Sequence, residues 1–427
     1  KSSVTGTTVE REPILAGDAD IDRFTATGSV QVRLESGARI FADVMDGSAP
    51  EQRVMLTGED VIIVAERLLL ERGRSYELRK SDGVMRGNGQ GEARIFSTPV
   101  LADTRDPVAP PTSATLDTEP DVFASWSESM RFDSLFNDEA GALDLRGNVD
   151  AISRPSAVQL DSLKGQSLRM EFVFANDVDN RPAGGANDAL LSIDRGQRAL
   201  GVMLADGDAR LESRIWEHDD LSDTPRVFYI SGPMIRYNNQ SGDALVDGAG
   251  EMLTRDVRPS EVIGGDREAF SARVVTRFRW AESLAMIHAF GDRYDVTMTG
   301  DVEVVHQSLY DDVTTITGET LGVTMLRTQT GEEMPATDAV ESGALGFGGD
   351  VDIRRLWGHG RLFIRTPTRE VECDRFDYNR YTELARIEAD PGRTVTVKDR
   401  QSARPVNAQV VLWNLRDDSI TIERAGG

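Results

Sequence analysis

Short segments in which apolar and polar residues alternate recur along the whole chain, and they limit its possible folds more than any other feature. Four of them alternate without a break: Val30–Leu34, Leu143–Arg146, Tyr294–Met298 and Thr394–Val397. Successive side chains of a strand point to opposite faces, so this pattern is typical of strands with one buried face. Glycine, Asp and Asn separate the segments, as expected at turns. The sequence therefore predicts an all-β fold of antiparallel strands.

Two stretches have a helical alternative. Val64–Arg72 could form two turns of helix, and Trp280–Ala289 could form nearly three. The second stretch matches Trp126–Leu135, which is a poor helical sequence. We therefore predict a strand, with or without a bulge, for Trp280–Ala289.

Internal repetition is the most informative feature. Trp126–Met130 matches Trp280–Leu284, and a Gly-Asx-Val phrase follows each of them. Eighteen residues after the glycine of that phrase, a further glycine opens a strand. In the first copy the later landmarks are Gly147–Val149, Gly165, Gly207–Ala209 and Met234–Asn238. Their counterparts in the second copy are Gly300–Val302, Gly318, Gly349–Val351 and Arg375–Asn379. A duplication explains this conserved order, and a shorter N-terminal copy carries Thr27–Gln31 and Leu56–Val61.

The repeats predict three β units, at residues 1–104, 122–260 and 261–427. Residues 105–121 contain four prolines, which exclude a central strand or a helix, so we predict a linker there. Asn176–Asn187 and Gln329–Ser342 are predicted loops.

Composition excludes several classes of protein. The net charge of −24 argues against non-specific nucleic-acid binding, which needs a basic surface. The longest apolar run, Val61–Ala65, is far shorter than a membrane-spanning helix. Cys373 is the only cysteine, so there is no disulfide framework. The start at Lys1 is what either a mature exported protein or a trimmed one would show.

The repeated phrase has a simple physical interpretation. Its glycine supplies a positive φ or a bulge where the chain turns. The Asx side chain is expected to bond its own backbone across the turn. In the strand that follows, every second side chain then points to the same face.

This phrase resembles the repeats of the organic-solvent-tolerance family of lipopolysaccharide-transport proteins. Ile230–Gly242 fits the first part of the family pattern, and Gly300–Val304 with Ile316–Leu321 fits the second. Glu372–Asn379 is a further copy, in which Glu383 replaces the expected glycine.

The resemblance implies tandem twisted β-jellyroll units, each open along one edge. The apolar interior would shield the acyl chains of lipopolysaccharide or a related lipid, without catalysis and without a cofactor. Units would join other β-jellyroll transport proteins edge to edge, in a periplasmic bridge between the inner and outer membranes. Membrane association would come only through partners or through a removed N-terminal segment. Family members are usually much shorter, so this chain would be a multi-unit version.

Alternating apolar residues are the candidates for the lipid-facing wall. They are Val30, Val32, Leu34, Leu143, Leu145, Val149, Val296, Met298, Val302 and Val304. Spacing alone fits an ordinary closed sandwich core equally well. A structural or adhesive β-repeat surface protein with closed cores is therefore the alternative, and a β-helical polysaccharide lyase or hydrolase is a third.

Other patterns give weak signals for a site. The histidines lie far apart in the sequence, and only His288 and His306 might approach each other across strands; the four are His218, His288, His306 and His359. Asp18, Asp20 and Asp22 lack the glycine and glutamate of a calcium loop. Gly87–Gly91 is predicted to be a turn. The tryptophans could stack on sugars, but the match of Trp126 with Trp280 favours structural packing. No nucleophile motif is present. The chain is therefore predicted to be neither an enzyme nor a metal protein.

Overall fold

The computed structural model confirms the all-β prediction. It describes residues 3–5, 22–34, 37–65, 67–96, 119–174, 198–216, 224–255, 275–307, 312–328, 350–400 and 404–425. The strand pairings given for these residues are all antiparallel. The predicted loops at 176–187 and 329–342 lie outside the described residues, as does nearly all of the proline-rich 105–121.

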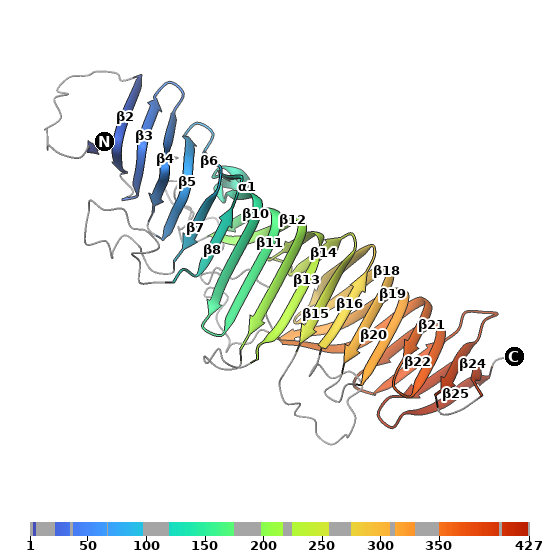
Figure 1. The fold of residues 1–427 in the computed structure, drawn as a ribbon. Helices are drawn as coiled ribbons and strands as arrows, with labels where there is room; N and C mark the ends of the chain where they lie inside the picture. The colour runs from blue at the N-terminus through green and yellow to red at the C-terminus, as the bar shows by residue number, and fades with distance from the viewer. Residues whose placement is uncertain are drawn as a thin grey trace. The chain divides into compact units, whose positions relative to one another are not determined.

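The chain divides into two compact units. Figure 1 labels most of their strands. Described residues of the first fall within Lys1–Pro155 and Asp161–Gly207, and those of the second within Ser156–Leu160, Asp208–Glu332 and Gly346–Gly427. The division into three independent domains stays a prediction.

Among the described residues, the first unit contains ten strands, the last of which ends at Ser156 in the second unit, and a short helix. They are β1 (Ser3–Thr5), β2 (Arg23–Arg33), β3 (Arg39–Ser48), β4 (Arg53–Val64), β5 (Leu68–Arg79), β6 (Val84–Asn88), β7 (Gly91–Ile95), β8 (Val122–Trp126), β9 (Ser129–Asp133), α1 (Phe136–Glu139) and β10 (Ala142–Ser156). The strands β11 (Gln159–Phe174) and β12 (Arg198–Ile215) contribute residues to both units.

The second unit is built from the remaining strands. They are β13 (Arg226–Asn238), β14 (Asp243–Asp247), β15 (Gly250–Arg255), β16 (Val275–Trp280), β17 (Ser283–Phe290), β18 (Arg293–Gln307), β19 (Val313–Thr328), β20 (Asp350–Arg365), β21 (Arg369–Asn379), β22 (Leu384–Glu388), β23 (Val395–Asp399), β24 (Val406–Asn414) and β25 (Ser419–Ala425).

The repeats of the sequence correspond to repeats of strand pairing. In the first unit β5 pairs along its length with β6 and β7, which are two successive segments of one bent strand. In turn, β6 pairs with β9 and β7 with β8, and β10 pairs with both β8 and β9. In the second unit this scheme is repeated by β13, by the successive segments β14 and β15, by the successive segments β16 and β17, and by β18. The strands β21 to β24 give a third copy, in which β24 alone takes the place of two strands. The duplication predicted from Trp126 and Trp280 is thus confirmed.

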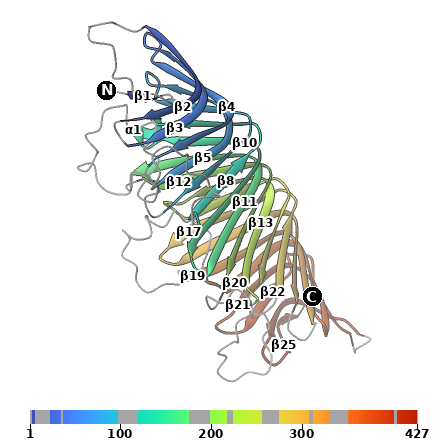
Figure 2. The same cartoon turned by 60° about the vertical axis from the view of Figure 1, so that its left-hand side comes forward.

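Each Gly-Asx phrase is a corner within a long strand. Gly300 (φ 79°) and Asp301 (φ 44°) are both left-handed, and at this point β18 changes its partner from β17 to β16. Gly147 (φ 82°) and Asn148 (φ 44°) do the same in β10. Two left-handed residues in a strand form a bulge that bends it. On one side of β10 and of β18 the two halves of the strand therefore have different partners, and the curvature of the strands can be followed in Figure 2.

A polar side chain lies over the corner glycines Gly147, Gly207, Gly300 and Gly360. A Cβ added to Gly300 would lie 2.5 Å from Cγ of Glu282, and Gly207 and Gly360 have the same relation to Gln166 and Glu319. The Gly-Gln and Gly-Glu phrases of the repeat supply these two last side chains. The predicted bond from Asx to its own backbone is wrong at Asn148, whose side chain contacts Ser127 and Gln166 instead.

The local expectations agree with the structure only in part. The helical alternative for Val64–Arg72 is wrong, since β4 ends and β5 begins there. Trp280–Ala289 is extended and not helical, as predicted, but it is broken between Trp280, where β16 ends, and Ser283, where β17 begins; a register shift lies between His288 and Phe290. The helix α1 was not expected from the sequence. The landmark Gly349 lies outside the described residues, and the corner that matches Gly207–Asp208 is Gly360–Arg361, with φ values of 80° and 39°.

Candidate functional site

The interior is formed by alternate residues of the bent strands. In β18 the buried side chains are Val296 and Met298 before the corner, and Val302 and Val304 after it. In both halves of the strand the apolar residues point inward and the polar residues between them point outward. Each unit therefore has an apolar interior and a polar exterior.

All ten candidate wall residues contribute to these interiors. Nine are buried, with at most 9% of their surface exposed, and Leu34, just after β2, is half-buried. Met298 pairs with Leu284 and Leu321 across neighbouring strands, and Leu145 pairs with Met130. The structure thus brings the predicted residues of each unit into continuous apolar rows. Lipid binding by them stays a prediction.

Several interior residues were not singled out from the sequence. Phe278, fully buried in the six-residue strand β16, is the partner of Val304. It lies between Arg277 and Arg279, so strict alternation over Thr276–Trp280 was the available signal. Phe132 in β9 is equally buried and pairs with Leu143.

The interior of the second unit loses its cover at its C-terminal edge. Along one row, Ile387 and Val411 are completely buried, whereas Ile422 in β25 is 48% exposed. In a second row, Val397 of β23 is buried, whereas its partner Val406 in β24 is 41% exposed. Among the described strands, β25 pairs with β24 alone. Inward-facing apolar side chains are therefore accessible from this edge.

The N-terminal edge of the first unit has a similar feature. Phe24 of β2 lies opposite Gly47 and packs against it, yet its side chain is 39% exposed. Two residues before Gly47 in β3 lies Met45, which pairs with Ala26 and is buried. Each unit thus has one edge at which part of its apolar interior meets solvent.

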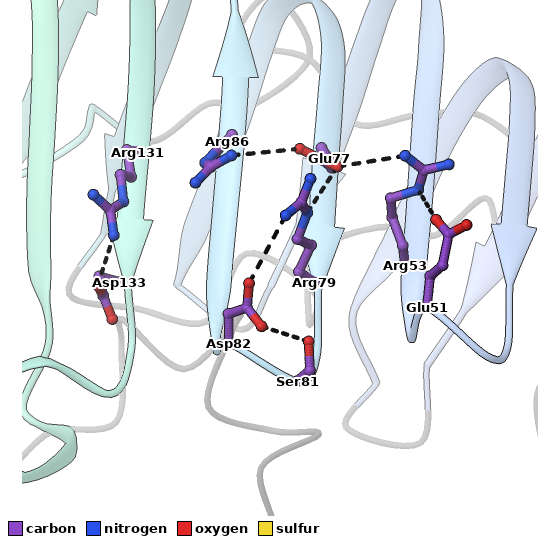
Figure 3. Close-up of polar contacts among 9 residues, drawn as sticks. All are labelled: Glu51, Arg53, Glu77, Arg79, Ser81, Asp82, Arg86, Arg131 and Asp133. Atoms are coloured by element: carbon purple, nitrogen blue, oxygen red, sulfur yellow. Dashed lines mark hydrogen bonds and ion pairs between the residues drawn. The ribbon is translucent and has the colours of Figure 1, made fainter.

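The outer face of the first unit carries a network of charges (Figure 3). Glu77 lies at its centre: its carboxylate is 2.9 Å from Nε of Arg79 and about 4 Å from guanidinium nitrogens of Arg53 and Arg86. Arg131 reaches Asp133 at 3.0 Å. The exposed pair of Arg131 and Asp133 contributes little to stability, whereas the side chain of Glu77 is only 10% exposed. These charges keep the outer face hydrated and distinguish it from the interior.

The histidines of the described residues form no metal site. His306 is buried and shares a 2.9 Å hydrogen bond with Thr276, and burial lowers its pKa. His288 pairs with Tyr294, which precedes the Gly300 corner of β18, whereas His306 follows that corner. The His288 ring shares a hydrogen bond with the carbonyl oxygen of Gly291. Within the part of the chain that the structure describes, no group of three potential ligands forms a metal site. His218, Asp18 and Asp20 lie outside that part.

The tryptophans of the first two repeats have a structural role, as predicted. Trp126 and Trp280 are buried, and each lies over the glycine opposite it, Gly91 or Gly250. Gly87–Gly91 was predicted to be a turn between strands, but it is a bend at Gly89 (φ 88°) between β6 and β7, which run in the same direction along β5. Trp357 also pairs with a glycine, Gly322, but on the outer face of β20.

The one cysteine is not a candidate nucleophile. Cys373 is buried in β21, and burial raises the pKa of its thiol to about 12. Only the thiolate is reactive, so the side chain is inert at neutral pH.

The sequence matches no protein-family model and no curated protein significantly. Among the described residues, the structure has no helix of the length and apolarity needed to cross a membrane. The interiors and their exposed edges are therefore the features from which function has to be argued.

Proposed function

We propose that this protein binds the acyl chains of lipopolysaccharide or a related amphipathic glycolipid in its apolar interior. It would do so in the periplasm, without catalysis, as part of a bridge between inner and outer membranes. The observation that carries the proposal is the row Ile387, Val411 and Ile422, in which a buried apolar interior reaches solvent at a sheet edge. Transfer of acyl chains from water to such a surface lowers the free energy of the system.

The corners support the proposal because they are bends in otherwise continuous strands. A bend such as Gly300–Asp301 joins two strand halves whose inner faces are both apolar, so the halves could separate slightly around an acyl chain without breaking a strand. The resemblance of Ile230–Gly242 and Gly300–Val304 to lipopolysaccharide-transport repeats points in the same direction.

The edge strands support the assignment of partners. The strand β25 has, among the described strands, one neighbour only, so its outer backbone groups can pair with an edge strand of another β-jellyroll protein. Ile422 and Val406 would be covered by such a partner.

Site-specific photocrosslinking tests the proposal. A benzoylphenylalanine at Ile422 lies on the inward face of β25, whereas at the adjacent Thr421 it lies on the outward face. In cells or with added lipopolysaccharide, we expect crosslinks to lipid from position 422 and few from position 421. Protein purified without detergent should also carry lipid in native mass spectrometry.

A second candidate is a structural β-repeat protein with closed cores. It is favoured by the packing of Met298, Val302 and Leu145, whose side chains are at most 1% exposed. A lipid-free mass spectrum together with equal, low crosslinking at positions 421 and 422 would support this candidate and contradict lipid binding.

A further inference from the structure

A hollow on the outer face of the second unit has features that neither lipid binding nor the repeat explains. Its volume is about 630 Å3, and it lies over β20, β21 and β22. Its lining includes two aromatic rings, two arginines and two carboxylates: Trp357, His359, Arg355, Arg386, Asp377 and Glu388. They alternate along their strands with buried residues such as Leu356 and Ile387, so they belong to the outward-facing set.

Trp357 departs from the pattern of the other repeat tryptophans. Like Trp126 and Trp280 it packs over the glycine opposite it, here Gly322. Those two indoles are buried in the interiors, whereas Trp357 is half-buried on the outer face and lines the hollow. The ring of His359 stacks on it, with centroids 5.9 Å apart and 18° between the planes. The glycine and the imidazole hold the indole in one orientation.

Donors and acceptors alternate beside this ring. Arg355 forms a two-pronged pair with Asp377, with Nε 2.8 Å from Oδ1. Arg386 pairs with Glu388 in β22 and with Glu423 in β25. Both guanidinium groups have raised pKa values, chiefly because of hydrogen bonds to these carboxylates. They therefore stay charged, and their planes are fixed.

The charge balance identifies the class of ligand. Since Arg355 and Arg386 are already neutralised by carboxylates, a phosphate or other anion would have to displace Asp377 or Glu388. A sugar hydroxyl both donates and accepts, so it can bond to a guanidinium and a carboxylate together. The apolar C–H face of a pyranose ring can at the same time pack on an indole.

We propose that this hollow is a binding site for a neutral pyranose saccharide, with Trp357 as the stacking surface and the two arginine–carboxylate pairs as hydroxyl partners. The inference is independent of lipid binding, because the hollow lies on the face opposite the apolar interior.

Isothermal titration calorimetry of the full chain with maltohexaose and chitohexaose tests the site. We expect binding of at least one of these oligosaccharides, about tenfold weaker in Trp357→Leu and in Arg386→Gln, because each loses a contact of the stated kind. Arg386→Gln changes an exposed side chain, so it remains informative if Trp357→Leu is poorly folded. The matched control is Arg365→Gln, an exposed, paired arginine of β20 that does not line the hollow, and it should leave binding unchanged.

Three results would overturn the inference. They are no heat from either oligosaccharide at millimolar concentration, equal weakening by Arg365→Gln, or binding of polygalacturonate or inorganic phosphate in preference to the neutral sugars. A loss of lipid crosslinking at position 422 would leave this test unaffected.

Discussion

Two hairpins of the second unit form the same turn with different residues. The β13–β14 hairpin and the β21–β22 hairpin both follow a Tyr-Asn pair, and both need a left-handed residue before the next strand. Gly242 (φ 76°) fills that position in the first, and Glu383 (φ 54°) fills it in the second. The pairing of the flanking strands therefore imposes the backbone conformation, and the residue has to accept it.

The surroundings explain why only one of the two has to be glycine. A Cβ at Gly242 would lie 2.7 Å from the hydroxyl oxygen of Tyr294. The side chain of Glu383 is 40% exposed, and its carboxylate is 3.8 Å from Arg416. The Glu383 turn thus has room for a side chain and carries only the conformational penalty of a non-glycine residue.

The largest expected effect comes from adding a side chain at Gly242 in the β13–β14 turn. Gly242→Ala should lower the free energy of unfolding by about 2 kcal/mol, since it adds left-handed strain to a clash with Tyr294. Urea denaturation followed by circular dichroism measures the change. A loss as small as that from an exposed alanine substitution elsewhere would show that the contact with Tyr294 yields.

The reverse substitution should stabilise the second turn. Glu383→Gly should raise the free energy of unfolding by about 1 kcal/mol, because relief of the left-handed strain exceeds the entropy of an added glycine. The lost pair with Arg416 is exposed and weak, so it subtracts little. Glu383→Ala is the matched control, and it should remain near the wild type. Equal stability of the two variants would contradict the strain at this turn.

The smallest effect concerns a feature that the two turns share. Asn238 accepts a hydrogen bond from the backbone of Gln240 at 3.0 Å, and Asn379 accepts one from Tyr381 at 2.9 Å. Asn238→Ala and Asn379→Ala should each lower the free energy of unfolding by about 0.5–1 kcal/mol. The two losses should agree in the same denaturation experiment. A much larger loss at Asn379 would mean that the strained turn depends on its asparagine.

Much of the fold could be predicted from local patterns. Alternation fixed the strands around Val302 and Val304, and the Gly-Asx phrase indicated the corner at Gly300 because only special residues accept a left-handed backbone. The absence of the expected glycine at Glu383 was visible in the sequence, but its strain was not, since the flanking pairing is what imposes the conformation.

Other features depend on pairing that the sequence does not state. The corner at Gly360–Arg361 was missed because arginine is a rare choice for a left-handed residue. Trp357 points outward because Leu356 and the alternate residues of β20 face the interior. The match between Trp126 and Trp280 did not indicate which residues of β20 would face inward. The exposure of Ile422 could not be predicted either, because it depends on which strand forms the edge.

The neighbour-to-neighbour pairing of β18 through β21 has a consequence for folding. Each of these long strands pairs with the next one along the chain, so loop closure costs little entropy and hairpins can form one after another. Such an array unfolds from its ends, as repeat proteins do. Amide hydrogens of β25 should therefore exchange with deuterium well before those of β19, and the edge that exposes Ile422 would also be the first to fray.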